Sequence, residues 1–93
     1  MKTVTVQIGN SDDKLTQIEW ARFITNIRMC LQRNATAIHF SGGSAFDMSW
    51  QNACFVFLIQ DNYLDDLRER LAYIRQEFRQ DSLAFTVGET EML

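Results

Sequence analysis

The sequence contains no proline, and it has only two cysteines, one histidine and four glycines among 93 residues. Two cysteines are too few for the disulfide framework that stabilises small secreted domains. One histidine and two separated cysteines lack the spacing of a metal site, so we expect no bound metal or cofactor. No apolar run approaches the roughly 20 residues of a membrane-spanning helix, and the alternating N-terminus does not resemble a signal peptide. We therefore expect a cytoplasmic protein that makes no membrane contact.

An excess of positive charge is also lacking. Nine Lys and Arg residues stand against twelve Asp and Glu, which gives a net charge of −3 and a pI near 4.9. Binding to a phosphate backbone requires clustered Lys and Arg, so we do not expect nucleic acid as a partner. Hydrophobic residues make up 46% of the chain and charged residues 23%, which is typical of a globular protein and not of a disordered one. The length predicts one domain, residues 1–93.

Hydrophobic periodicity predicts six elements in the order β-α-β-β-α-β. The predicted strands and helices are strand 3–8, helix 17–33, strand 36–41, strand 52–59, helix 64–78 and strand 83–87. Strand 52–59 is apolar on both faces, so it belongs in the centre of a sheet together with the first strand. This order predicts a ferredoxin-like α+β fold, in which two helices cover one face of a four-stranded antiparallel sheet.

Local signals predict where several of these elements begin and end. Thr16 and Glu19 have the spacing of a capping box at the start of the first helix. Asp61 and Asn62 follow the third strand, where their side chains could cap the second helix. Residues 42–43 are both glycine, and we expect them to end the second strand.

The sheet face away from the helices is expected to be apolar in its centre. Period-two alternation places the following residues on it: Thr3, Thr5, Gln7, Cys54, Val56, Leu58, Ser82, Ala84 and Thr86, with His39 and Ser41 added if Ile38 and Phe40 point inward. A monomer rarely exposes such a stripe to water. We therefore expect a homodimer, with an ordinary solvated face as the alternative.

The connection between the second and third strands is long and unusually apolar. It spans residues 41–51, where hairpins commonly use two to five residues. It carries Phe46, Met48 and Trp50, with Asp47 among them. Large apolar side chains on a loop hinged by glycine suit a protein partner or a planar ligand. The alternative is that this segment folds back and completes the core.

A second group of candidate binding residues is polar. Gln80, Asp81 and Ser82 end the second helix and lead into the fourth strand, while Gln51 and Asn52 open the third strand. These residues could form a binding rim at one end of the sheet. They could equally be a capping and turn cluster, because Asp and Ser side chains bond readily to nearby backbone.

His39 is the only candidate for acid–base chemistry. It would need a partner, and Asp47 or Gln7 could serve. A lone strand histidine is more often structural or part of an interface, so His39 is kept among the binding residues. Cys30 and Cys54 lie on apolar elements, where burial disfavours the reactive thiolate. We assign no catalytic residue.

Three segments resemble a family of small phage and bacterial proteins of unknown function. They are Gly9-Asn10 with Leu15-Thr16 and Glu19-Trp20, the block Trp50-Gln51-Asn52-Ala53-Cys54, and the closing Ile74-Arg75, Phe78 and Gln80-Asp81-Ser82-Leu83. The resemblance implies a ferredoxin-like domain and a phage origin. A phage origin would favour a host-defence inhibitor that blocks or sequesters a component of the host cytoplasm.

These observations favour a non-enzymatic binding protein. It would act as a dimer and capture a host protein or a small nucleotide-like ligand by stoichiometric binding. A small enzyme with a pocket that uses His39 as acid or base is the alternative. A purely structural or assembly subunit is a third possibility.

Overall fold

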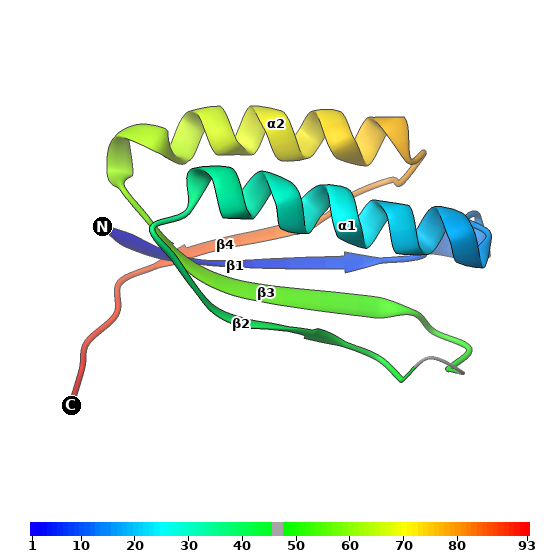
Figure 1. The fold of residues 1–93 in the computed structure, drawn as a ribbon, viewed down its shortest axis with the longest axis horizontal. Coiled ribbons are helices and arrows are strands. Elements are labelled where there is room, and N and C mark those ends of the chain that lie inside the picture. The colour runs from blue at the N-terminus through cyan, green and yellow to red at the C-terminus, as the bar shows by residue number, and fades with distance from the viewer. Residues whose placement is uncertain (46–47) are drawn as a thin grey trace.

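The computed structural model describes residues 1–45 and 48–93, which form four strands and two α-helices. In chain order these are β1 (Lys2–Gly9), α1 (Gln17–Asn34), β2 (Ala37–Gly43), β3 (Asn52–Ile59), α2 (Leu64–Glu77) and β4 (Ala84–Gly88), with short 3-10 turns η1 (Ser11–Asp13) and η2 (Asp61–Tyr63) before the helices. The strands form one antiparallel sheet in the order β2-β3-β1-β4, and both helices cover the same face (Figure 1). The predicted ferredoxin-like α+β layout, with β1 and β3 in the centre, is confirmed.

The core lies between the sheet and the two helices. Alternate residues of β1 and β3 point toward the apolar stripes of α1 and α2, and the buried set is Val4, Val6, Ile8, Leu15, Trp20, Phe23, Ile27, Cys30, Leu31, Ala53, Phe55, Phe57, Ile59, Leu67 and Leu71. The Phe23 ring stacks on Phe78 with centroids 5.1 Å apart. Burying each large side chain contributes about 1.5–3 kcal/mol relative to exposure. Among the described residues, neither helix is long and apolar enough to cross a bilayer.

The first helix begins as the capping box predicts, and the second does not. The Glu19 N–H donates to the Thr16 hydroxyl at 3.2 Å, and the Thr16 N–H donates to the Glu19 carboxylate at 3.1 Å. The predicted cap from Asp61 is wrong, because α2 begins after Tyr63 with no side-chain cap. Turn η2 occupies this position instead, where the Tyr63 N–H donates to the Gln60 carbonyl at 3.0 Å. Such a turn satisfies backbone groups that a cap would otherwise bind.

Strand β2 contains a bulge that the alternation pattern did not reveal. Ile38 pairs with Phe57 and Phe40 pairs with Val56, so His39 is an extra residue with no partner of its own on β3. The residues after the bulge therefore face the opposite side from the one predicted. The expectation of an inward Phe40 and an outward Ser41 is wrong, since Phe40 pairs with Val56 on the side away from the helices.

Both glycines belong to β2, which ends at Gly43 and not before Gly42 as predicted. A Cβ atom on Gly42 would lie 2.8 Å from Cζ of Phe40, so glycine leaves room for the aromatic ring along the strand. A Cβ atom on Gly43 would clash with the carbonyl oxygen of Asn52 on β3. The strand continues to Gly43 because these glycines allow close approach.

Candidate functional site

Three rows of cross-strand neighbours form the side of the sheet away from the helices, which we call the open face. The rows are Ala37, Leu58, Thr3 and Gly88, then Phe40, Val56, Thr5 and Thr86, then Gly42, Cys54, Gln7 and Ala84. None of these twelve positions carries a charged side chain, although charged residues make up 23% of the chain. Depletion of charge is characteristic of the core of a protein interface.

Phe40 is the largest side chain on the open face. It remains 52% exposed, and it lies in the middle row beside Val56. Val56, Leu58 and Cys54 are half-buried by their neighbours. The prediction for β1, β3 and β4 is confirmed, except that Ser82 lies before the start of β4. The open face is therefore an apolar stripe over β2 and β3, flanked by Thr and Gln side chains on β1 and β4.

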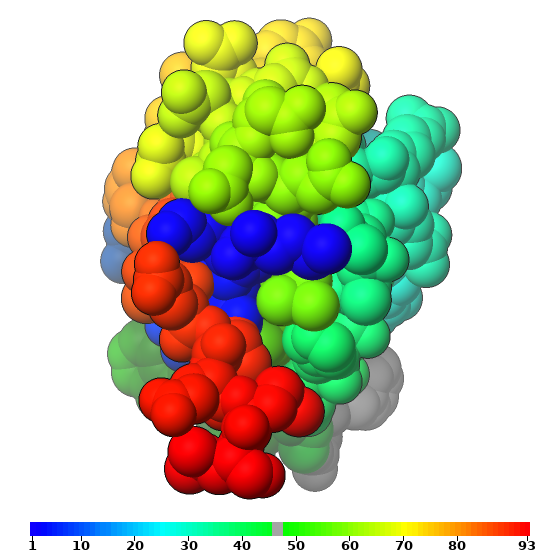
Figure 2. All heavy atoms as spheres, turned by 90° about the vertical axis from the view of Figure 1, so that its left-hand side faces the viewer, coloured from blue at the N-terminus to red at the C-terminus, as the bar shows by residue number. Residues whose placement is uncertain are grey.

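Two segments border the open face at opposite ends of the sheet. The β2–β3 connection lies at one end, and residues 89–93 leave β4 at the other (Figure 1). Figure 2 shows that residues 89–93 extend beyond the sheet on the side away from α2. In the connection, Trp50 is 82% exposed and Met48 is also exposed, so neither completes the core. The candidates Phe46 and Asp47 lie outside the described residues.

Most residues of the predicted polar rim lie where β1, β3 and the helix ends meet, a region that we call the polar corner. Gln80 is only 3% exposed, and its side-chain oxygen accepts the Ser11 N–H at 2.9 Å while its amide donates to the Phe78 carbonyl at 3.0 Å. The Asn10 amide donates to the side-chain oxygen of Gln51 at 3.0 Å. Both glutamines therefore make their hydrogen bonds inside the protein, which favours the capping and turn interpretation.

The remaining rim residues divide between the corner and the surface. The Asp81 carboxylate accepts a hydrogen bond from the Lys14 ammonium at 3.0 Å. The Asn52 N–H donates to the Ser44 hydroxyl at 3.0 Å, which closes the β2–β3 hairpin. Ser82 is exposed and lines a groove between α2 and β4. Asp81 lines the same groove, while Asn52 and Gln51 line smaller hollows near the start of β3.

Asn10 is a residue of this corner that the sequence analysis left out of the site. Its side chain accepts the Leu15 N–H at 2.9 Å and donates to the Leu15 carbonyl at 3.0 Å, besides its bond to Gln51. Asn10 thus joins the end of β1 to the start of α1 and to β3. Its place directly after a strand and before a helix cap is the signal that could have identified it.

The acid–base partners suggested for His39 do not come together. His39 is exposed at the bulge of β2, whereas Gln7 lies on β1 with β3 between them. Strands two places apart are separated by about 10 Å, beyond hydrogen-bond reach. Asp47 lies outside the described residues. In the described part of the chain, no three His, Cys, Asp or Glu side chains cluster as metal ligands.

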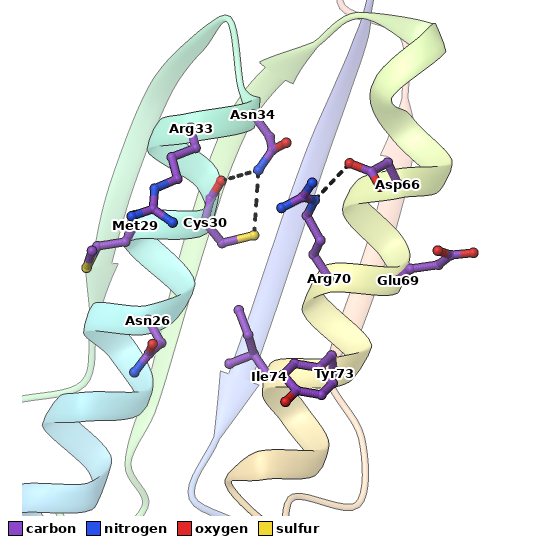
Figure 3. A pocket seen from close by; sticks show the side chains of 10 residues that line it. All are labelled: Asn26, Met29, Cys30, Arg33, Asn34, Asp66, Glu69, Arg70, Tyr73 and Ile74. Atoms are coloured by element: carbon purple, nitrogen blue, oxygen red, sulfur yellow. Dashed lines mark hydrogen bonds and ion pairs between the residues drawn. The ribbon is translucent and has the colours of Figure 1, made fainter.

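A groove of about 460 Å³ lies between α1 and α2 (Figure 3). Cys30 and Arg70 point into it from opposite helices. Arg70 donates to the Asp66 carboxylate at 2.8 Å, and burial raises the pKa of the Cys30 thiol. The thiol is therefore protonated at neutral pH and is a poor nucleophile. Cys54 lies on the other side of the sheet, so the two cysteines do not form a disulfide.

The segments that carry the resemblance to phage and bacterial proteins meet in this polar corner. Asn10 contacts Gln51, and Ser11 contacts Gln80, so all three segments are joined there. The chain matches no protein-family model and no curated protein. The resemblance therefore stays a prediction.

Proposed function

We propose that the protein is a non-enzymatic binding protein that works as a homodimer, with the open faces of two copies packed together. The observation that carries this proposal is the complete lack of charged side chains at the twelve positions of the open face. An apolar stripe flanked by small polar groups suits another sheet better than it suits water.

The bulge at His39 supports the same conclusion. A bulge leaves one residue out of the hydrogen-bonded ladder, so it has a cost in sheet pairing. Here it moves Phe40 from the helix side to the middle row of the open face. Burying an aromatic ring contributes about 1.5–3 kcal/mol, and this gain is available only when a second surface covers the ring.

The area of the open face is compatible with a dimer of modest size. Neighbouring strands lie about 4.8 Å apart, and residues on one face of a strand recur about every 6.8 Å. The four strands and three rows of the open face therefore cover about 400 Å² of sheet. Two faces give about 800 Å² of plane, which is below the range of about 1,200–2,000 Å² for stable interfaces. Protruding side chains such as Phe40 increase the accessible area above the planar value, so the proposed dimer is a small one.

A face-to-face dimer leaves the β2–β3 connection free at the end of each sheet. This connection presents Trp50 and Met48 to solvent. Exposed aromatic and Met side chains are enriched in protein interfaces. We assign partner or ligand capture to this segment, so that one dimer presents two equal capture surfaces and gains avidity for a partner with two sites.

Analytical ultracentrifugation tests the dimer directly. The wild type should sediment as a dimer at tens of micromolar. Phe40→Glu should raise the dissociation constant by about 30-fold or more, which corresponds to the roughly 2 kcal/mol of a central aromatic residue. Tyr73→Glu is the matched control, because Tyr73 is an exposed aromatic residue on α2. A monomeric wild type, or equal dissociation of both variants, would contradict the proposal.

Native mass spectrometry tests the capture surface. Protein purified from its natural host should retain a bound mass, and Trp50→Ala should lose it while the dimer and the melting temperature stay unchanged. Truncating an aromatic anchor commonly costs about 2 kcal/mol or more of binding. A bound mass that is retained equally by Trp50→Ala would exclude the β2–β3 connection as its site.

A further inference from the structure

The outer edge of β4 is open to pairing with another strand. Within the described sheet β4 pairs only with β1, so alternate backbone N–H and C=O groups on its other side have no ladder partner. Natural edge strands are usually protected by charge, proline or a bulge. Strand β4 has a continuous register with β1, and Ala84–Gly88 contains neither a charged residue nor proline. The opposite edge, β2, carries the bulge at His39.

A groove of about 360 Å³ runs between this edge and α2. Its apolar lining comes from Leu71 and Ala72 on α2, from Phe85 on β4 and from Leu83 directly before β4. Three charged residues border the groove: Arg68, Arg75 and Asp81, whose carboxylate is already paired with the Lys14 ammonium at 3.0 Å. The Arg68 guanidinium lies 5.3 Å from the centroid of the Phe85 ring. A strand added beside β4 would direct every second side chain into this groove.

Both arginines keep hydrogen-bond donors for a further partner. Arg68 donates through one nitrogen to the exposed Asp65 carboxylate at 2.9 Å. Arg75 donates through one nitrogen to the carbonyls of Gln80 and Asp81, at 2.9 and 3.3 Å. A guanidinium has five N–H donors, and its fork matches a carboxylate. Pairing of β4 with a second copy would bring like-charged arginines together, so the charge favours an acidic occupant.

We propose that the outer edge of β4 captures an extended, acidic segment of a protein partner, which joins the sheet as a fifth strand. Its apolar side chains enter the groove, and its carboxylates bind Arg68 and Arg75. In this mode of recognition backbone hydrogen bonds supply affinity, and pockets for alternate side chains supply specificity. The edge and the open face are different surfaces, so this binding does not depend on the dimer.

A fluorescein-labelled peptide of sequence Glu-Thr-Val-Thr-Val-Thr-Glu tests the proposal, because its Glu and Val side chains all face the groove when it is extended. Fluorescence anisotropy should show saturable binding in the micromolar range. The same peptide with Lys in place of Glu should bind at least about tenfold more weakly, as should one with alternate backbone amides methylated. Hydrogen exchange should show new protection in β4.

Two arginines on α2 provide a matched pair of variants. Arg68 and Arg70 are similarly exposed, at 50% and 57%, and each pairs with an aspartate, but only Arg68 borders the β4 groove. Arg68→Glu should weaken peptide binding at least about tenfold, and Arg70→Glu should not. Arg68→Gln, which adds no repulsive charge, should change affinity in the same direction as Arg68→Glu.

The outcomes separate this proposal from the dimer. Phe40→Glu should retain peptide binding even when it sediments as a monomer. Absence of saturable binding at millimolar peptide, equal binding of the Lys peptide, or equal loss in Arg68→Glu and Arg70→Glu would overturn capture at the β4 edge.

Discussion

The outer surface of the helices and the open face of the sheet are both presented to water, yet their chemistry is opposite. Helix α2 carries both acids and bases, and two pairs of them meet across one helical turn: Asp65 with Arg68 at 2.9 Å and Asp66 with Arg70 at 2.8 Å. The open face has no charged side chain in any of its three rows. A surface meant for water keeps hydrated charges, whereas a surface meant to be covered avoids the cost of desolvating them.

The same contrast applies to the exposed aromatic residues. Tyr73 is 65% exposed on α2, where charged neighbours surround it and its hydroxyl can bind water. Phe40 has no polar group, and its neighbours across the sheet are Val56 and, one strand further, Thr5. Exposed Tyr73 therefore needs no partner, while exposed Phe40 indicates a surface that is covered in use.

The largest difference in stability is expected between alanine variants of two phenylalanines that face opposite sides of the sheet. Phe55 is fully buried against the helices, and Phe55→Ala should lower the free energy of unfolding by about 3–5 kcal/mol. Phe40→Ala should change the unfolding free energy of the monomer by less than about 1 kcal/mol, because the ring is half exposed. Urea denaturation of dilute protein measures both values. Comparable losses in the two variants would mean that Phe40 belongs to the core.

Alanine variants of a buried and an exposed glutamine test the same contrast for polar side chains. Gln80→Ala leaves the Ser11 N–H without its side-chain acceptor, and we expect a loss of about 1–3 kcal/mol in unfolding free energy. Gln76→Ala, on the exposed side of α2, should change it by no more than about 0.5 kcal/mol. Equal free energies of unfolding for Gln80→Ala and Gln76→Ala would show that the side chain of Gln80 contributes nothing to stability.

The capping box at the start of α1 should have a smaller effect. Thr16→Ala removes the hydroxyl that accepts the Glu19 N–H, and such losses cost about 0.5–2 kcal/mol. Thr25→Ala is a matched control, since Thr25 lies mid-helix and bonds only to the Ala21 carbonyl of its own helix. An unchanged midpoint for Thr16→Ala would contradict the assigned helix start.

The smallest effect on stability is expected for the ion pair that joins the first turn of α1 to the chain just after α2. The Arg79 guanidinium donates to the Glu19 carboxylate at 2.7 Å. Together with the hydrogen bond from the Thr16 backbone, this contact lowers the pKa of Glu19 from 4.5 to about 2. The folded state therefore prefers the ionised carboxylate, and this stabilisation is complete above pH 4.5 and lost as the pH falls toward 2.

Glu19→Gln isolates that dependence because glutamine can still occupy the capping-box position. Acid denaturation should show the wild type losing more stability than the variant between pH 4.5 and pH 2, where the Glu19 carboxyl takes up its proton. The difference is small because the pair is partly exposed and screened by water. Parallel acid curves for the two proteins would exclude the ion pair as a source of stability.

The fold could be predicted from the sequence because most elements carry a strong local pattern. Residues 3–8 alternate, the stripe of α2 recurs every three or four residues, and Thr16 marks the start of α1. The bulge at His39 has no such pattern, since it depends on how Phe40 and Gly42 fit against β3. One extra residue there was enough to reverse the predicted facing of Phe40.

The site was harder to predict because its contacts join distant parts of the chain. The hydrogen bond between Asn10 and Gln51 links residues 41 positions apart, and the bond between Ser11 and Gln80 links residues 69 apart. No periodicity indicates such pairs. The groove beside β4 likewise exists only because α2 packs next to the sheet edge. The β2–β3 connection could be identified as a candidate site because Trp50 and Met48 are residue types that loops rarely contain.

Protection of Cys54 from alkylation tests the burial of the open face most directly. Cys54 lies in the third row of that face, while Cys30 lies in α1 and serves as an internal reference. Iodoacetamide labelling can be followed for both thiols by peptide mass spectrometry over a range of protein concentrations. The dimer predicts that the rate at Cys54 falls as concentration rises, that Cys30 does not change, and that Phe40→Glu restores the fast rate. A Cys54 rate that is independent of protein concentration while the wild type remains folded would contradict the account.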